Sequence, residues 1–144
     1  VTDMPFDEWR RVLSVNLDGA FLSLQAALRA MRDGGSIVCV ASAAALKAEK
    51  GIGAYAASKA GLVQLARVAA KESADRKVRV NVMAPGGVET PMWESEEFMA
   101  RAAQVGRDRV FADLAATGTP IGRFAKPEEI AAQIAFLLTN ETSG

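Results

Sequence analysis

Histidine is absent from the 144 residues, and cysteine and tyrosine each occur only once. Without histidine, His-based catalytic triads and most zinc sites are excluded, and we expect no bound metal. The lone Cys39 cannot form an internal disulfide framework and is typical of a reducing compartment. Any acid–base chemistry must therefore use tyrosine, lysine or carboxylates.

The sequence also has no charge excess, since 17 basic residues balance 17 acidic ones. This balance gives no indication of a nucleic-acid partner. Long apolar runs are missing, so we expect no membrane span, and no signal or transit segment is visible. We therefore expect a cytoplasmic protein. Because the chain starts at Val1 rather than Met, we also expect that the beginning of a longer protein is missing.

The segment Ala54–Lys71 contains a tyrosine and a lysine, two of the residue types that acid–base chemistry can use in a chain without histidine. It is rich in alanine and has no proline, which predicts one long helix. Tyr55 and Lys59 are four residues apart and would share one face of it. A lysine ammonium beside a phenol favours the phenolate, so such a tyrosine can exchange a proton with a carbonyl or alcohol oxygen. A chance match to this short pattern is common on helices, and it is the alternative interpretation.

An earlier helix is predicted over Phe6–Met31, where apolar residues recur every three or four positions. Asn16 falls on this apolar face. A buried amide is costly unless it is hydrogen-bonded, so Asn16 is either a structural amide or part of a site.

Two short apolar segments predict parallel strands. Ser36–Ser42 is almost wholly apolar and β-branched, as in a central strand buried on both faces. Ser42 would lie at its carboxyl end, where open α/β sheets bind ligands, although a plain turn residue is the commoner case. Val78–Ala84 predicts the second strand. Gly86 and Gly87 follow it, and they permit either positive φ and close approach of a ligand or simply a tight turn.

The rest of the chain predicts helices. Trp93–Thr119 mixes apolar and charged residues and predicts one or two amphipathic helices, either a flap over an apolar ligand or ordinary packing. Pro127–Leu138 begins with proline and two acids, as a final helix would. Alternating helices and strands predict an α/β fold with a doubly wound parallel sheet. Two strands are too few for it, so we expect further strands outside this sequence.

Taken together, these motifs resemble the short-chain dehydrogenase/reductase family. Asn16 lies on a helix, Ser42 ends a strand, Tyr55 follows thirteen residues later, and Lys59 four after that. The segments Y-A-A-S-K-A-G and V-N-V-M-A-P-G, and the stretch G-R-F-A-K-P-E-E-I-A before the last helix, complete the pattern. The resemblance covers Phe6–Gly144 and implies part of a single Rossmann-like dehydrogenase domain spanning residues 1–144, with a substrate flap at about 88–120.

The resemblance also implies roles for the matching residues. Tyr55 would be the general acid/base, and Lys59 would stabilise its phenolate and hold the nicotinamide ribose. Ser42 would orient the substrate oxygen, and Asn16 would hold a water near Lys59. The loop Pro85–Thr90 would bind the nicotinamide carboxamide. Its residues in that role are Pro85, Gly86, the backbone of Val88 and the hydroxyl of Thr90.

The family's Gly-rich phosphate-binding turn has no counterpart here, and neither does the residue that chooses between NAD and NADP. The family's last strand is also missing. The missing elements are disordered, sit in another chain, or were lost by truncation. We favour the first explanation because nothing in the retained half looks decayed.

Two classes of function remain open. The first is an oxidoreductase that transfers a hydride between NAD or NADP and a small secondary alcohol or ketone. The second is a non-catalytic fragment or binding subunit that cannot hold cofactor, because a fold does not guarantee a function. An epimerase or dehydratase with the same Tyr–Lys pair is a weaker third, because the loop Pro85–Met92 argues against it. The family also implies a homo-oligomer, a dimer or tetramer. The stripe of Leu62, Leu65, Ala66 and Ala69 suits such an interface, or the core.

Overall fold

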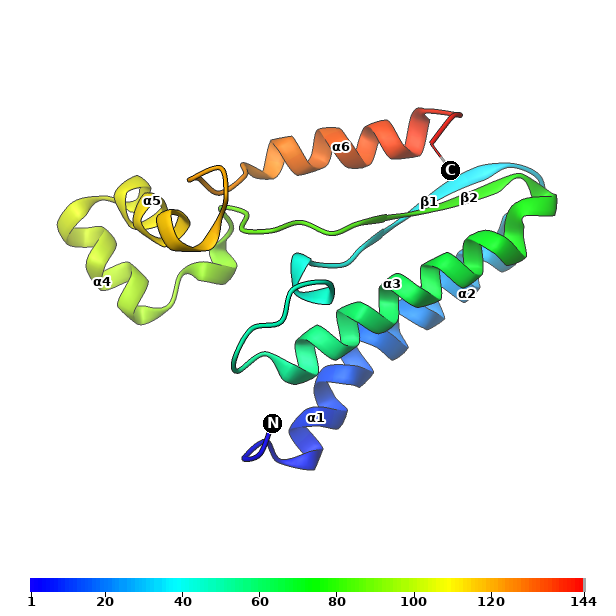
Figure 1. Ribbon diagram of the computed structural model, residues 1–144. Coiled ribbons are helices and arrows are strands. Elements are labelled where there is room, and N and C mark those ends of the chain that lie inside the picture. The colour runs from blue at the N-terminus through cyan, green and yellow to red at the C-terminus, as the bar shows by residue number, and fades with distance from the viewer. Residues whose placement is uncertain (144) are drawn as a thin grey trace. The chain divides into compact units, whose positions relative to one another are not determined.

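The computed structural model describes residues 1–143 and shows helices that alternate with two parallel strands (Figure 1). The strands are β1 (Gly35–Val40) and β2 (Val78–Met83). The α-helices are α1 (Phe6–Leu13), α2 (Gly19–Ala30), α3 (Gly53–Ser73), α4 (Glu96–Val105), α5 (Arg107–Gly118) and α6 (Pro127–Thr139). Short 3-10 turns at Ala43–Ala45, Ala74–Arg76 and Pro91–Trp93 join them, and a π-helical turn at Ser14–Asp18 separates α1 from α2. The predicted α/β class is confirmed.

The chain divides into two compact units. The first contains Val1–Ala84 and Ile134–Gly144, and the second contains Pro85–Gln133. Helix α6 begins in the second unit and ends in the first. The strands and α3 belong to the first unit, whereas α4 and α5 belong to the second.

In the first unit, β1 and β2 pair in parallel from Gly35 opposite Val78 to Val40 opposite Met83. Successive side chains of a strand point to opposite faces. Ile37 and Cys39 of β1, with Val80 of β2, therefore share one face, and this face packs against α2 and α3. Figure 1 shows these two helices running side by side along the sheet. The helices cover the apolar face and so place their own residues next to the strands.

The opposite face of the strands carries polar side chains that bind the end of the chain. The guanidinium of Arg79 donates hydrogen bonds to the carbonyl oxygens of Leu137 at 3.0 Å and Ser143 at 2.6 Å. The hydroxyl of Ser36 donates to the same Leu137 oxygen at 3.0 Å. The prediction that β1 is buried on both faces is wrong for this unit, because Val40 is 44% exposed.

Helix α3 lies close to the sheet because small residues form its buried face. Ala66 and Ala69 are buried together with Leu24 of α2 and Val80 of β2. Leu62 is buried in a neighbouring cluster with Ala41. The apolar stripe on α3 is thus largely core, and its candidate role as an oligomer interface is wrong for these buried residues.

The single helix predicted over Phe6–Met31 is interrupted. At Gly19 the backbone N–H donates to the carbonyl of Ser14, five residues back, instead of four. This wider turn defines the π segment Ser14–Asp18, which contains Asn16. Helix α2 then ends at Ala30, because Met31 is extended.

The second unit has its own apolar core. Buried aromatic and aliphatic side chains from α4, α5 and the segment before α6 form it, namely Phe98, Val110, Phe111, Ala115 and Phe124. Phe111 lies 4.9 Å from Phe98 and 5.7 Å from Phe124 between ring centroids. The predicted flap is therefore two helices, and their buried apolar residues pack against one another. Met92 and Met99 remain exposed.

Replacing Leu62 with alanine should lower the free energy of unfolding by about 2–5 kcal/mol, because the side chain is only 3% exposed. Urea unfolding of the protein that contains this chain measures the loss. The matched control is Leu46→Ala, where the leucine is 75% exposed and the change should be within about 0.5 kcal/mol. Equal losses at both positions would contradict the assignment of Leu62 to the core.

Candidate active site

Tyr55 and Lys59 lie one turn apart near the start of α3, as the sequence predicts. The Lys59 ammonium nitrogen is 5.9 Å from the centroid of the Tyr55 ring. The same nitrogen donates a hydrogen bond of 3.1 Å to the carbonyl oxygen of Val40, the last residue of β1. Lys59 therefore joins the helix to the carboxyl end of the strand and places its positive charge beside the phenol.

Asn16 faces the same helix from the π-helical turn. Its amide nitrogen donates to the hydroxyl of Ser58 at 3.2 Å, and that hydroxyl donates to the carbonyl of Tyr55 at 2.7 Å. Ser58 is 0% exposed, and both bonds are partly buried. The Asn16 amide nitrogen thus ties its turn to α3, next to Tyr55 and Lys59. Such π turns often occur at functional sites.

Ser42 lies two residues beyond the end of β1, not in the strand itself. Its backbone is extended, and its hydroxyl oxygen accepts a hydrogen bond of 3.2 Å from the N–H of Ala44, capping the 3-10 turn Ala43–Ala45. A serine hydroxyl has one proton to donate besides its lone pairs. In the described residues the Ser42 proton has no acceptor, so the turn leaves it available to a ligand oxygen.

The loop Pro85–Thr90 lies in the second unit and begins two residues beyond the end of β2. At Val88 it forms a one-residue parallel bridge with Ala125. The bridge consists of two bonds of 2.9 Å, from Ala125 N–H to the Gly87 oxygen and from Glu89 N–H to the Ala125 oxygen. In such a bridge the N–H and C=O of the central residue point the other way. Across residues 1–143 those two groups of Val88 have no hydrogen-bond partner.

The two glycines of this loop do not use positive φ, so that expectation is wrong. Gly87 is needed for space instead, because a Cβ there would lie 2.5 Å from the ring of Phe124. A Cβ at Gly86 would meet nothing within 4 Å. The loop is therefore packed tightly on one side at Gly87 and open at Gly86. Thr90 ends it, and its side chain does not cap the turn that follows.

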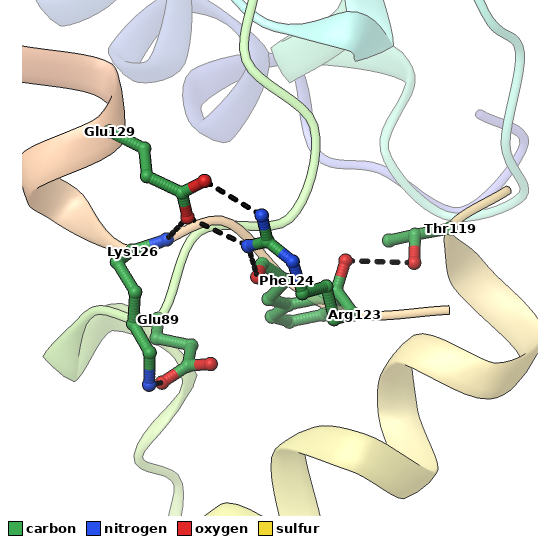
Figure 2. Close-up of polar contacts among 6 residues, drawn as sticks. All are labelled: Glu89, Thr119, Arg123, Phe124, Lys126 and Glu129. Atoms are coloured by element: carbon green, nitrogen blue, oxygen red, sulfur yellow. Dashed lines mark hydrogen bonds and ion pairs between the residues drawn. The ribbon is translucent and has the colours of Figure 1, made fainter. Parts of the chain in front are cut away.

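A network of charged side chains surrounds the segment that pairs with the loop (Figure 2). The Arg123 guanidinium binds both carboxylate oxygens of Glu129 at 2.7 Å. The backbone N–H of Lys126 also donates to Glu129, at 2.7 Å, which caps the start of α6. The Lys126 ammonium pairs with Glu89 at 2.5 Å. These bonds join the loop to the start of α6.

Sequence reasoning missed several of these residues. Ser58 connects Asn16 to Tyr55, and its position three residues after Tyr55 on a buried helical face was the available signal. Glu89 and Lys126 lie 37 residues apart, and no local pattern relates them. Among residues 1–143 we find no group of acids and cysteine able to hold a metal ion. None of the helices in that range is long and apolar enough to cross a membrane.

Comparison with known proteins identifies the family. A family model described as enoyl-(acyl carrier protein) reductase matches residues 1–144. The 3-oxoacyl-(acyl-carrier-protein) reductase FabG of Thermotoga maritima is 40% identical and is matched over 97% of this chain and 53% of its own length. The 2,3-dihydro-2,3-dihydroxybenzoate dehydrogenase of Escherichia coli is 38% identical, over 95% of this chain and 56% of its own.

Solved structures agree with this match. The ligand-free aldohexose dehydrogenase of Thermoplasma acidophilum gives a TM-score of 0.83 at 29% identity, covering 99% of this chain and 56% of its own. A short-chain dehydrogenase family protein of Francisella tularensis also gives 0.83, at 26% identity, and this chain covers 59% of it. The matched proteins are thus reductases and dehydrogenases with an α/β fold. The chain belongs to the short-chain dehydrogenase/reductase family, and it spans about half the length of the curated relatives it matches.

Replacing Glu129 with glutamine should flatten the acid dependence of stability. The bonds from Arg123 and then from the Lys126 N–H lower the pKa of Glu129 from 4.5 to about 2. A lowered pKa in the folded state stabilises the fold above pH 4.5, and this stabilisation is lost as the pH falls through about 2. Urea unfolding at several pH values within this window measures the slope.

The control for this experiment is Glu128→Gln, in the same first turn of α6. Its carboxylate makes no ion pair in the described part of the chain. A variant at Glu129 that kept the full acid dependence of the parent would contradict the proposed network.

Proposed function

We propose that the protein containing this chain is an NAD- or NADP-dependent oxidoreductase that interconverts a secondary alcohol and a ketone. The observation that supports it most is the pairing of Tyr55 with Lys59 at the end of β1. The Lys59 nitrogen lies 5.9 Å from the Tyr55 ring and is fixed by the Val40 carbonyl. This geometry fixes a cation beside a phenol, an arrangement suited to proton exchange with a carbonyl or alcohol oxygen.

The residues of the Pro85–Thr90 loop fit a nicotinamide carboxamide. A carboxamide presents one acceptor oxygen and two N–H donors. The Val88 N–H and C=O point away from the bridge with Ala125 and offer one donor and one acceptor. Gly86 leaves open space beside them, and the Thr90 hydroxyl is a further donor. When bound, the cofactor supplies or accepts the hydride.

The remaining steps belong to the side chains of the first unit. Tyr55 gives a proton to the carbonyl oxygen during reduction and takes it back during oxidation. Ser42 donates its free proton to the same oxygen and orients it. Lys59 keeps its positive charge beside the phenol and holds the ribose of the cofactor. Asn16, fixed by Ser58, holds a water that passes protons towards Lys59. We propose that both units belong to one dehydrogenase domain, with its phosphate-binding part outside this sequence.

The relatives act on different substrates by name, so we assign only the class of a small alcohol or ketone. A cytoplasmic location remains our expectation. The alternative, a binding subunit or fragment that cannot hold cofactor, predicts no binding of NADH or NADPH by the complete protein. Titration of both cofactors, followed by fluorescence, separates these two functions.

Replacing Tyr55 with phenylalanine should lower kcat by at least about 10²–10⁴-fold, because only the exchangeable proton is lost. The rate of alcohol oxidation or ketone reduction by the complete protein measures it. Cofactor affinity and the melting temperature should stay near those of the parent, since the ring remains. Appreciable residual turnover would reject Tyr55 as the acid/base.

We also propose a homo-oligomer, a dimer or tetramer, formed through the outer groove between α2 and α3. Exposed apolar side chains line this groove, among them Phe21 and Val68. Arg29 and Glu72 line it too. A two-fold interface joins one patch to itself, and a patch with both charge signs can pair with its own copy.

Replacing Val68 with aspartate should shift the assembly towards monomers, because it places a charge in the apolar contact. The mass in solution, measured by light scattering after size exclusion, reports it. Leu46→Asp, on an exposed loop of the same unit, is the control and should leave the mass unchanged. An unchanged mass for Val68→Asp would reject this face.

A further inference from the structure

The bridge at Val88 is short, so contacts besides its own hydrogen bonds are needed to hold it in place. It has two backbone hydrogen bonds, both to Ala125. A single bridge outside a longer ladder gains little cooperative support from neighbouring pairs. Since Val88 presents the donor and acceptor proposed for the carboxamide, any movement of this bridge would displace both groups together.

The ion pair of Glu89 with Lys126 lies at the next position along both strands of the bridge. Glu89 follows Val88, Lys126 follows Ala125, and their charged atoms are 2.5 Å apart. Figure 2 shows the two side chains reaching towards each other. The Glu89 side chain is only 15% exposed, the lowest fraction among the ion-paired acids in the described part of the chain. A carboxylate shielded in this way depends on its partner, so loss of Lys126 would free the loop to move.

The Lys126 side of the pair is anchored independently. The backbone N–H of Lys126 is held by Glu129, which also binds Arg123 through two bonds. Phe124 is buried in the core of the second unit and touches the space beside Gly87. The segment 123–126 is therefore held in place, and the Glu89–Lys126 pair connects it to the loop by charged side chains. The same contact raises the pKa of Lys126, so its ammonium stays charged at neutral pH.

We propose that Glu89 and Lys126 are positioning residues that hold the backbone N–H and C=O of Val88 in place for the nicotinamide carboxamide. Neither side chain need touch the cofactor. The pair acts through Val88 and sets the affinity for the nicotinamide end only. This inference rests on the proposed function, because it requires a nicotinamide cofactor at this loop.

The test compares two ligands of the complete protein by isothermal titration calorimetry. One is the reduced dinucleotide, and the other is its ADP-ribose counterpart, which lacks the nicotinamide. Lys126→Met keeps the aliphatic stem but removes the charge. We expect it to raise the Kd of the dinucleotide by about tenfold, as loss of a charged hydrogen bond does. The Kd of the ADP-ribose ligand should change by less than about twofold.

Two variants serve as controls. Lys126→Arg retains the pair with Glu89 and should bind both ligands as the parent does. Arg101→Met removes a different ion pair of the second unit, with Asp113 between α4 and α5, and should also leave both affinities unchanged. If Lys126→Met does not fold, as judged by circular dichroism, Glu89→Gln removes the charge from the other side with little change in shape. It should give the same selective loss.

The outcomes distinguish a failure of this inference from a failure of the proposed function on which it rests. Suppose that the parent binds the dinucleotide. If the variants lower the affinity for both ligands equally, or for neither ligand, the positioning role is overturned and the proposed function stands. A loss in Lys126→Arg as large as that in Lys126→Met would also overturn it. If the parent binds neither ligand, the proposed function and this inference are both rejected.

Discussion

The close contact of α3 with the two-stranded sheet is the constraint on which the first unit depends. Ala66 and Ala69 allow the helix to lie against Val80 and the neighbouring strand residues. The helix then brings Lys59 to the carbonyl of Val40, and Tyr55 one turn before it. A larger side chain at the alanines would lift the helix and break this connection. The packing of small apolar residues, rather than any polar bond, thus decides where the candidate acid/base is placed.

In the second unit, apolar packing likewise positions the groups of the candidate site, and here these are backbone groups. Its aromatic core fixes Phe124, and Phe124 in turn requires glycine at position 87. The loop is consequently pressed against the segment before α6, and the bridge at Val88 turns one peptide's donor and acceptor outward. An extended loop that was not bridged would have many orientations for those groups. The charged network around α6 holds the loop in place and takes no part in proton or hydride transfer.

Sequence reasoning predicted the elements whose signals are local. The helical spacing of Tyr55 and Lys59, both strands and the start of α6 at Pro127 all follow from periodicity and capping. Where the cause is distant in sequence, it left two alternatives open or missed the contact. The buried stripe on α3 depends on Leu24 and Val80, and the pairing of Glu89 with Lys126 spans 37 residues. The predicted site residues were also assigned through family resemblance, and no spacing rule alone would have joined Ser42 or Val88 to Tyr55.

The π-helical turn at Ser14–Asp18 bears on how a helix accommodates a change in sequence length. A turn closed by a bond across five residues holds one residue more than an α-helical turn. The side chains of α1 and α2 are therefore offset, as they would be if one residue were inserted into a continuous helix. Asn16 lies within this turn, and its amide nitrogen donates to Ser58 of α3. A single length change, rather than a substitution, can thus add a polar group to an apolar surface without rebuilding the core.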